Sequence, residues 1–115
     1  IRVNSLAPTA GTRMTADIFP DEAYAAFQPE AVVPAALYLV SRDAPNDAIV
    51  AAGGGVCQSA FITMNEGVLL EGDDLGVEGF ARAWPVIADR QGDRVLETGM
   101  EQAHHALSVL LKSRD

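Results

Sequence analysis

Cysteine and histidine are scarce in this chain of 115 residues. Cys57 is the only cysteine, so no disulfide can form within the chain. His104 and His105 are adjacent, and adjacent side chains of a helix point about 100° apart, so these two cannot share one metal ion as a pair four residues apart does. We therefore predict no disulfide framework and no metal site. A single cysteine in an acidic chain favours a reducing compartment, and we expect the cytoplasm.

Basic side chains are few as well. Sixteen acidic residues stand against eight lysines and arginines, which gives a net charge of −8. Binding to a phosphate backbone needs clustered Lys and Arg, so the charge argues against a nucleic-acid partner. No run reaches the ~18 apolar residues of a membrane span, so we expect no membrane partner. With 49% hydrophobic and 21% charged residues, the composition is that of an ordinary globular domain.

Groups that usually carry catalysis are also missing. Lys112 is the only lysine, so neither Tyr24 nor Tyr38 belongs to a Tyr-x-x-x-Lys pair. Cys57 has no histidine near it in sequence, and a cysteine after an apolar strand is usually an inert small hydrophobe. The glycines of residues 53–55 are not followed by Lys-Ser or Lys-Thr, so they indicate a turn at a strand end and not a phosphate loop. We predict no catalytic residue in this chain.

The first half of the chain predicts a strand, a helix and a second strand. Residues 1–7 are mostly apolar and stop at Pro8, which favours a short strand. A short helix is expected within residues 17–27, and a longer one over residues 29–41, where Pro29 suits the first helical position. Residues 48–52 form an apolar run that ends at the three glycines, as a buried strand does. This order indicates a parallel crossover unit whose further partner strands come from elsewhere.

The second half predicts a hairpin and two helices. Residues 56–64 and 67–71 flank Asn65-Glu66-Gly67, which predicts a hairpin turn. A helix over residues 77–83 is expected to break at Trp84-Pro85, and the last helix runs over about residues 97–112. Its apolar stripe lies opposite Glu101, His105 and Lys112 and consists of Met100, Ala103, Leu107, Leu110 and Leu111. The chain thus divides into residues 1–55 and an extension of residues 56–115.

Several of these segments resemble short-chain dehydrogenases/reductases. Ile1-Arg2-Val3-Asn4-Ser5-Leu6-Ala7-Pro8 resembles the sixth strand of that family, with Thr9 where glycine is usual. Residues 7–15, Ala-Pro-Thr-Ala-Gly-Thr-Arg-Met-Thr, are most similar to the (3R)-hydroxyacyl-CoA dehydrogenase branch, as in peroxisomal multifunctional enzymes of type 2. Residues 33–39 resemble the penultimate helix and residues 49–55 the last strand. Residues 80–87 and the last helix are similar to the tail of this branch.

The resemblance implies an α/β fold, namely the C-terminal part of a Rossmann-like doubly wound parallel sheet with a hairpin and a helical C-terminal extension. The resemblance implies NAD or NADP as cofactor and the oxidation or reduction of a hydroxyl/ketone pair. The substrate that it implies first is a 3-hydroxyacyl-CoA of fatty acid metabolism, and a steroid or another substrate is the alternative. The family's glycine-rich loop and its Ser, Tyr and Lys group precede the sixth strand. The chain starts at Ile1 without Met, so we expect a missing N-terminal part of the same protein to carry them.

The residues that the resemblance places beside the nicotinamide are Pro8, Thr9, Gly11 and Thr12. In many relatives the hydroxyl lies one residue later, where this chain has Arg13. Small residues let backbone groups reach a carboxamide, and a threonine hydroxyl can bond a cofactor oxygen. The alternative is that this segment only connects a strand to a helix.

Two hypotheses about partners and function stay open at this point. The family's association surfaces imply a homodimer or homotetramer through the helix of residues 29–41 and the strand of residues 48–55. The other hypothesis is a non-catalytic oligomerisation module with a short-chain dehydrogenase-like fold, whose apolar helix pairs with another chain.

Overall fold

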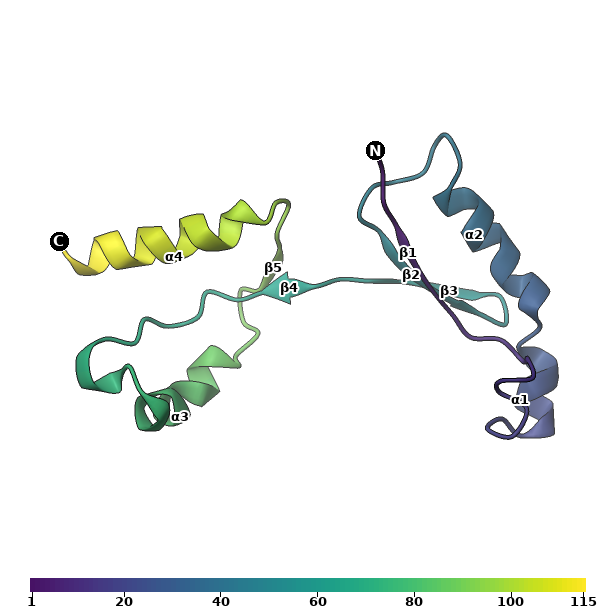
Figure 1. Cartoon of the computed structure of the whole chain (residues 1–115), viewed down its shortest axis with the longest axis horizontal. Coiled ribbons are helices and arrows are strands. Elements are labelled where there is room, and N and C mark those ends of the chain that lie inside the picture. The colour runs from purple at the N-terminus through teal and green to yellow at the C-terminus, as the bar shows by residue number, and fades with distance from the viewer. The chain divides into compact units, whose positions relative to one another are not determined.

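The computed structural model describes all residues from Ile1 to Asp115, and they form two compact units, Ile1–Phe61 and Ile62–Asp115. The first unit contains β1 (Ser5–Pro8), α1 (Asp21–Ala26), the 3-10 helix η1 (Pro29–Val32), α2 (Val33–Leu39), β2 (Ile49–Gly53) and β3 (Val56–Ala60) (Figure 1). The second contains β4 (Thr63–Met64), the 3-10 helix η2 (Gly72–Asp74), α3 (Val77–Ile87), β5 (Arg94–Val95) and α4 (Met100–Ser113). The first unit therefore includes β3, and the functional division of the chain after residue 55 stays a prediction.

The sheet of the first unit has three strands in the order β1-β2-β3. β1 runs parallel to β2, with Ser5 opposite Ile49 and Pro8 opposite Ala52, and β3 runs antiparallel to β2. The predicted strand-helix-strand unit with parallel strands is confirmed, and the fold is mixed α/β with a small mixed sheet. Because β2 lies between two strands, both its edges are paired. Association of two copies through residues 48–55 and the helix before them stays a prediction.

The hairpin of this chain lies elsewhere than the sequence predicted. β2 and β3 are joined by Gly54 and Gly55, whose φ angles are +59° and +86°. A tight two-residue turn of the common hairpin type needs positive φ at both positions, which two glycines adopt at little steric cost. The predicted hairpin around residues 65–67 was wrong, because residues 67–71 form no strand and β4 pairs with β5 instead. The Asn65 amide donates to the Ile87 carbonyl at 2.7 Å.

β4 pairs with β5, and no strand forms over residues 67–71. The helices also differ in detail from those expected. Residues 29–32 are 3-10 and only then does α2 begin, and α4 starts at Met100. The break expected at residues 84–85 was wrong, because α3 continues through Pro85 to Ile87. Pro85 removes one hydrogen bond, and the rings of Phe80 and Trp84, one turn apart with centroids at 6.0 Å, pack along the same helix.

Little of the apolar surface of the chain is covered. Only Val32, Leu39, Ala44 and Ala52 are buried apolar residues. The chain exposes 9075 Å², whereas two separate compact units of half its mass would expose about 7,300 Å². The exposed surface of the chain is therefore roughly 1,800 Å² larger than that of two compact units, and this excess is open to contact with other protein surface. No helix has the length and apolar character needed to cross a membrane.

The Asn4 side chain joins three segments of the first unit. Its amide nitrogen Nδ2 donates to the carbonyls of Leu39 at 3.2 Å and Pro45 at 2.8 Å, and its Oδ1 accepts the Ala48 N–H at 2.9 Å. The end of α2 and the start of β2 are thus held beside the start of β1.

Asn4→Ala is expected to lower the free energy of unfolding by about 2 kcal/mol, because three hydrogen bonds are lost and partly buried backbone groups lose their partner. Denaturant unfolding of the protein measures the loss. Asn46→Ala is the matched control, since the exposed Asn46 Oδ1 accepts one N–H, from Val3 at 2.9 Å, and its removal should cost less than half as much. Equal losses for the two variants would contradict the joining role of Asn4.

Candidate functional site

The segment of residues 8–15, here called the β1 loop, begins at the carboxyl end of β1. Pro8 ends that strand opposite Ala52, and the Thr9 N–H donates to the Ala52 carbonyl at 2.8 Å. Because β1 and β2 are parallel, their carboxyl ends lie at the same edge of the sheet. Thr9 accordingly lies against Gly53 at the end of β2, where an added Cβ would come within 2.9 Å of the Thr9 Cβ.

Hydrogen bonds within the β1 loop fix its course. The Thr15 hydroxyl accepts the Thr12 N–H at 2.8 Å and lies 2.8 Å from the Ala10 carbonyl, to which it donates. The Thr12 hydroxyl accepts the Met14 N–H at 3.2 Å and keeps its own proton for another acceptor. Sequence reasoning missed Thr15, although Thr-x-x-Thr after a strand is a spacing at which a hydroxyl can hold a turn.

Gly11 lies where the β1 loop passes α1. Its N–H donates to the Phe27 carbonyl, and a Cβ at this position would lie 2.5 Å from the Tyr24 carbonyl oxygen and 3.2 Å from the Tyr24 ring. Only glycine fits such a close approach without a shift of backbone. The glycine is therefore explained by packing, whatever else the loop contacts.

The four residues predicted as a site lie together in this loop. Pro8, Thr9 and Thr12 are exposed and Gly11 is half-buried. Bonds within the loop use the N–H groups of residues 12, 14 and 15, and bonds to Ala52 and Phe27 use those of residues 9 and 11. The N–H groups of Ala10 and Arg13 are left as open donors. Open N–H groups next to threonine hydroxyls can bind a small polar group such as a carboxamide. No group suited to proton transfer lies in the loop itself.

Gly53 and Phe27 lie beside the β1 loop, and neither was predicted as part of the site. Gly53 lies beside Thr9, and the rings of Phe27 and Phe19 lie 5.5 Å apart next to the loop. The signal for Gly53 was present in the sequence, because it ends the second of two strands expected to be parallel. No sequence pattern indicated Phe27, because its position depends on how α1 folds back onto the β1 loop.

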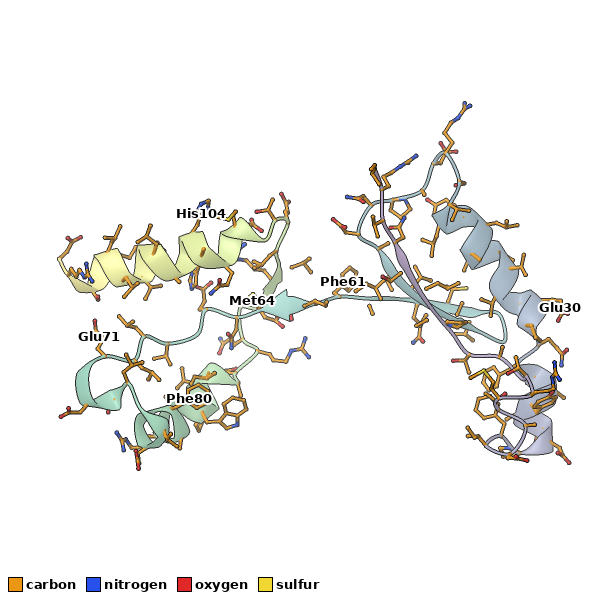
Figure 2. All side chains as sticks on the ribbon, viewed as in Figure 1. Glu30, Phe61, Met64, Glu71, Phe80 and His104 are labelled. Atoms are coloured by element: carbon orange, nitrogen blue, oxygen red, sulfur yellow. The ribbon has the colours of Figure 1, made fainter.

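The second unit holds a groove of about 540 Å³ between α4 and the segment after β4. α4 turns Glu101, His105 and Val109 toward this segment, and these three are half-buried. His105 Nε2 lies 2.9 Å from the Glu66 carbonyl oxygen. Figure 2 shows His104 pointing away from the segment that carries Met64.

The apolar stripe of α4 is exposed, contrary to the usual packing of such a stripe. Met100, Leu107 and Leu111 expose 60%, 53% and 53% of their surface. The Glu101 carboxylate turns toward the segment before α4, where it accepts the N–H groups of Thr98, at 3.2 Å, and Glu97. These bonds hold the pKa of Glu101 below its usual value, and the Arg94 guanidinium adds to the effect.

Comparison with known proteins identifies the relatives of this chain. No family model matches the sequence. A protein of Mycobacterium tuberculosis named as a short-chain type dehydrogenase/reductase is 35% identical over 96 residues, which cover 83% of this chain and 33% of that protein. The chain is a relative of short-chain dehydrogenases/reductases. It spans about a third of the length of that relative.

Two further matches concern larger enzymes. The peroxisomal hydratase-dehydrogenase-epimerase of Neurospora crassa is 49% identical over 45 residues, which cover 39% of this chain and 5% of that protein. The structure of full-length peroxisomal multifunctional enzyme type 2 from Drosophila melanogaster superimposes with a TM-score of 0.78 over 97% of this chain and 21% of that one, at 22% identity. The resemblance to short-chain dehydrogenases/reductases is confirmed by the sequence matches, and the structural match shows a shared fold.

Proposed function

We propose that this chain is the C-terminal part of an NAD(P)-dependent short-chain dehydrogenase/reductase and that its β1 loop contacts the cofactor. The observation that carries the proposal is the place of Thr9 and its neighbours at the carboxyl edge of the parallel strands β1 and β2. In open α/β sheets, ligands bind outside that edge. β1 and β2 would then be the last parallel strands of a doubly wound Rossmann-like sheet.

The residues of the β1 loop suit the nicotinamide end of the cofactor. Open N–H groups of Ala10 and Arg13, with the hydroxyls of Thr9 and Thr12, offer donors and acceptors for a carboxamide. Nicotinamide supplies the hydride transfer when bound, and this chain's part is to orient the ring. The Ser, Tyr and Lys group of the family would come from the rest of the protein.

The substrate that we propose is a 3-hydroxyacyl-CoA. Support comes from the matches to a hydratase-dehydrogenase-epimerase and to multifunctional enzyme type 2. Both names include the word peroxisomal, so a peroxisomal location has support beside the cytoplasmic one expected from composition.

NADH oxidation with a 3-ketoacyl-CoA tests the proposal in the full-length protein that contains this sequence. We expect turnover, and we expect Thr12→Val to raise the KM for NADH about fivefold, because one hydrogen bond contributes about 1 kcal/mol. Thr98→Val, in the second unit before α4, is the matched control and should leave this KM unchanged. Turnover by the 115-residue chain alone, or full-length protein that turns over no nicotinamide cofactor, would refute the proposal.

The alternative, a non-catalytic oligomerisation module, is favoured by the uncovered apolar surface of α2. Val33, Leu37 and Tyr38 expose 48%, 63% and 54% of their surface. Sedimentation combined with titration of NADH fluorescence separates the two functions. A stable oligomer that binds no nucleotide would favour the module.

A further inference from the structure

Arg13 is the only basic residue of the β1 loop. The first unit contains three arginines and no lysine. Arg2 precedes β1, and its Nη1 donates to the Arg42 carbonyl at 2.7 Å. Arg2 and Arg42 therefore lie at the amino end of the parallel strands, because Arg2 comes before β1 and Arg42 before β2. Arg13 follows β1, so it alone places a positive charge on the carboxyl side of the sheet.

No ion pair neutralises Arg13. Its side chain is exposed, and the ion pairs of the chain all lie in the second unit. Asp17 is the nearest acidic residue in the sequence, and it is not paired with Arg13. Residues 1–16 contain two arginines and no acidic residue, in a chain whose net charge is −8. The surroundings of the β1 loop therefore favour an anion more than the rest of the chain does.

We propose that the Arg13 guanidinium binds a phosphate group of the molecule that lies against the β1 loop. A guanidinium donates two parallel N–H bonds to phosphate oxygens, and such charge-assisted bonds are about twice as strong as those between neutral groups. The open N–H groups of Ala10 and Arg13 suit the neutral carboxamide, and the Arg13 side chain suits the phosphate. This inference rests on the proposed function, because it takes the cofactor to lie at this loop.

The cofactor is the nearer of two sources of such a phosphate. In NAD and NADP, a single ribose separates the nicotinamide from the diphosphate. In an acyl-CoA, the whole pantetheine arm separates the reacting acyl group from the phosphates. A side chain of a loop that orients the nicotinamide is therefore closer to the cofactor diphosphate than to the phosphates of coenzyme A.

Titration of NADH fluorescence in the full-length protein tests the contact. Arg13→Gln should raise the dissociation constant of NADH about tenfold, because hydrogen bonds between charged groups are the stronger ones. Arg13→Lys should recover only part of the affinity, since an ammonium keeps the charge but lacks the planar pair of donors. Arg42→Gln is the matched control. It removes the same charge from an exposed position at the amino end of the strands and should leave the affinity unchanged.

Salt dependence gives a readout that a merely structural role of Arg13 would not change. The affinity of the wild type for NADH should fall as sodium chloride is added, because salt screens an exposed ionic contact. Arg13→Gln should be less sensitive to salt than the wild type, and Arg42→Gln should be as sensitive. Equal salt sensitivity of the wild type and Arg13→Gln would show that Arg13 makes no ionic contact with the cofactor.

A second arm distinguishes the cofactor from coenzyme A. The KM of Arg13→Gln is measured for a 3-ketoacyl group on coenzyme A and for the same group on pantetheine, which carries no phosphate. A rise in KM confined to the coenzyme A thioester would assign the contact to the substrate phosphates.

Two negative results have different meanings. Wild-type affinity for NADH and wild-type KM for the coenzyme A thioester in Arg13→Gln would overturn the phosphate contact and leave the proposed function standing. A wild-type protein that binds neither NADH nor NADPH would overturn both.

Discussion

Gly11→Ala is expected to raise the dissociation constant of NADH about tenfold or more in the full-length protein, a loss of at least about 1.4 kcal/mol. The added Cβ would lie 2.5 Å from the Tyr24 carbonyl oxygen and 3.3 Å from that of Phe27. Both are backbone atoms of α1 or its end, so the β1 loop must move away from the helix. That movement shifts the hydroxyls of Thr9 and Thr12 and the open N–H groups of Ala10 and Arg13.

Titration of NADH fluorescence measures the change, and circular dichroism checks that the variant is folded. Gly99→Ala is the matched control, because no atom lies within 4 Å of an added Cβ and the φ angle of Gly99 is −65°. We expect wild-type affinity for this control. Wild-type affinity in Gly11→Ala would show that the loop does not contact the cofactor and only connects β1 to α1.

The parts of the fold that local patterns encode could be predicted. β1 and β2 are apolar runs that end at Pro8 and at the glycines of residues 53–55, and their parallel pairing follows from the helix between them. The hairpin was misplaced because residues 53–55 were interpreted as a strand end only. The second strand, residues 56–60, contains Gln58 and Ser59 and has no alternating apolar face that would mark it.

The apolar stripe of α4 shows what helical periodicity alone does not predict. Periodicity identifies which residues of a helix share a face, and that part of the prediction was sound. It does not say which face meets the chain itself. The bonds of the Glu101 carboxylate to N–H groups before the helix, and the contact of His105 with the Glu66 carbonyl, orient the face of Glu101 and His105 toward the chain. Leu107 and Leu111 therefore remain exposed.

The candidate site depended on the family resemblance more than on the residues alone. Nothing in the composition distinguishes Thr9 and Thr12 from the threonines of an ordinary connecting loop. The structure adds the contact of Thr9 with Gly53, which follows from the parallel register, and the bonds made by Thr15. Phe27 could not have been predicted, because its contact depends on the path of the chain between two elements.

Gly54→Val is expected to lower the free energy of unfolding by about 2 kcal/mol or more, because a β-branched residue is strongly disfavoured at positive φ. Gly54 has a φ of +59° at the first turn position between β2 and β3. Loss of this turn separates β3 from β2. Denaturant unfolding measures the change in the free energy of unfolding.

Gly54→Asn separates backbone conformation from crowding. Both variants add a Cβ that would lie 3.3 Å from the Phe27 ring, so crowding at this atom is the same. Asparagine adopts positive φ readily, and Asn-Gly is a preferred pair in such turns. We expect Gly54→Asn to lose less than about 1 kcal/mol of the free energy of unfolding. Equal losses in the two variants would mean that contact with Phe27, and not the left-handed backbone of the turn, requires glycine at this position.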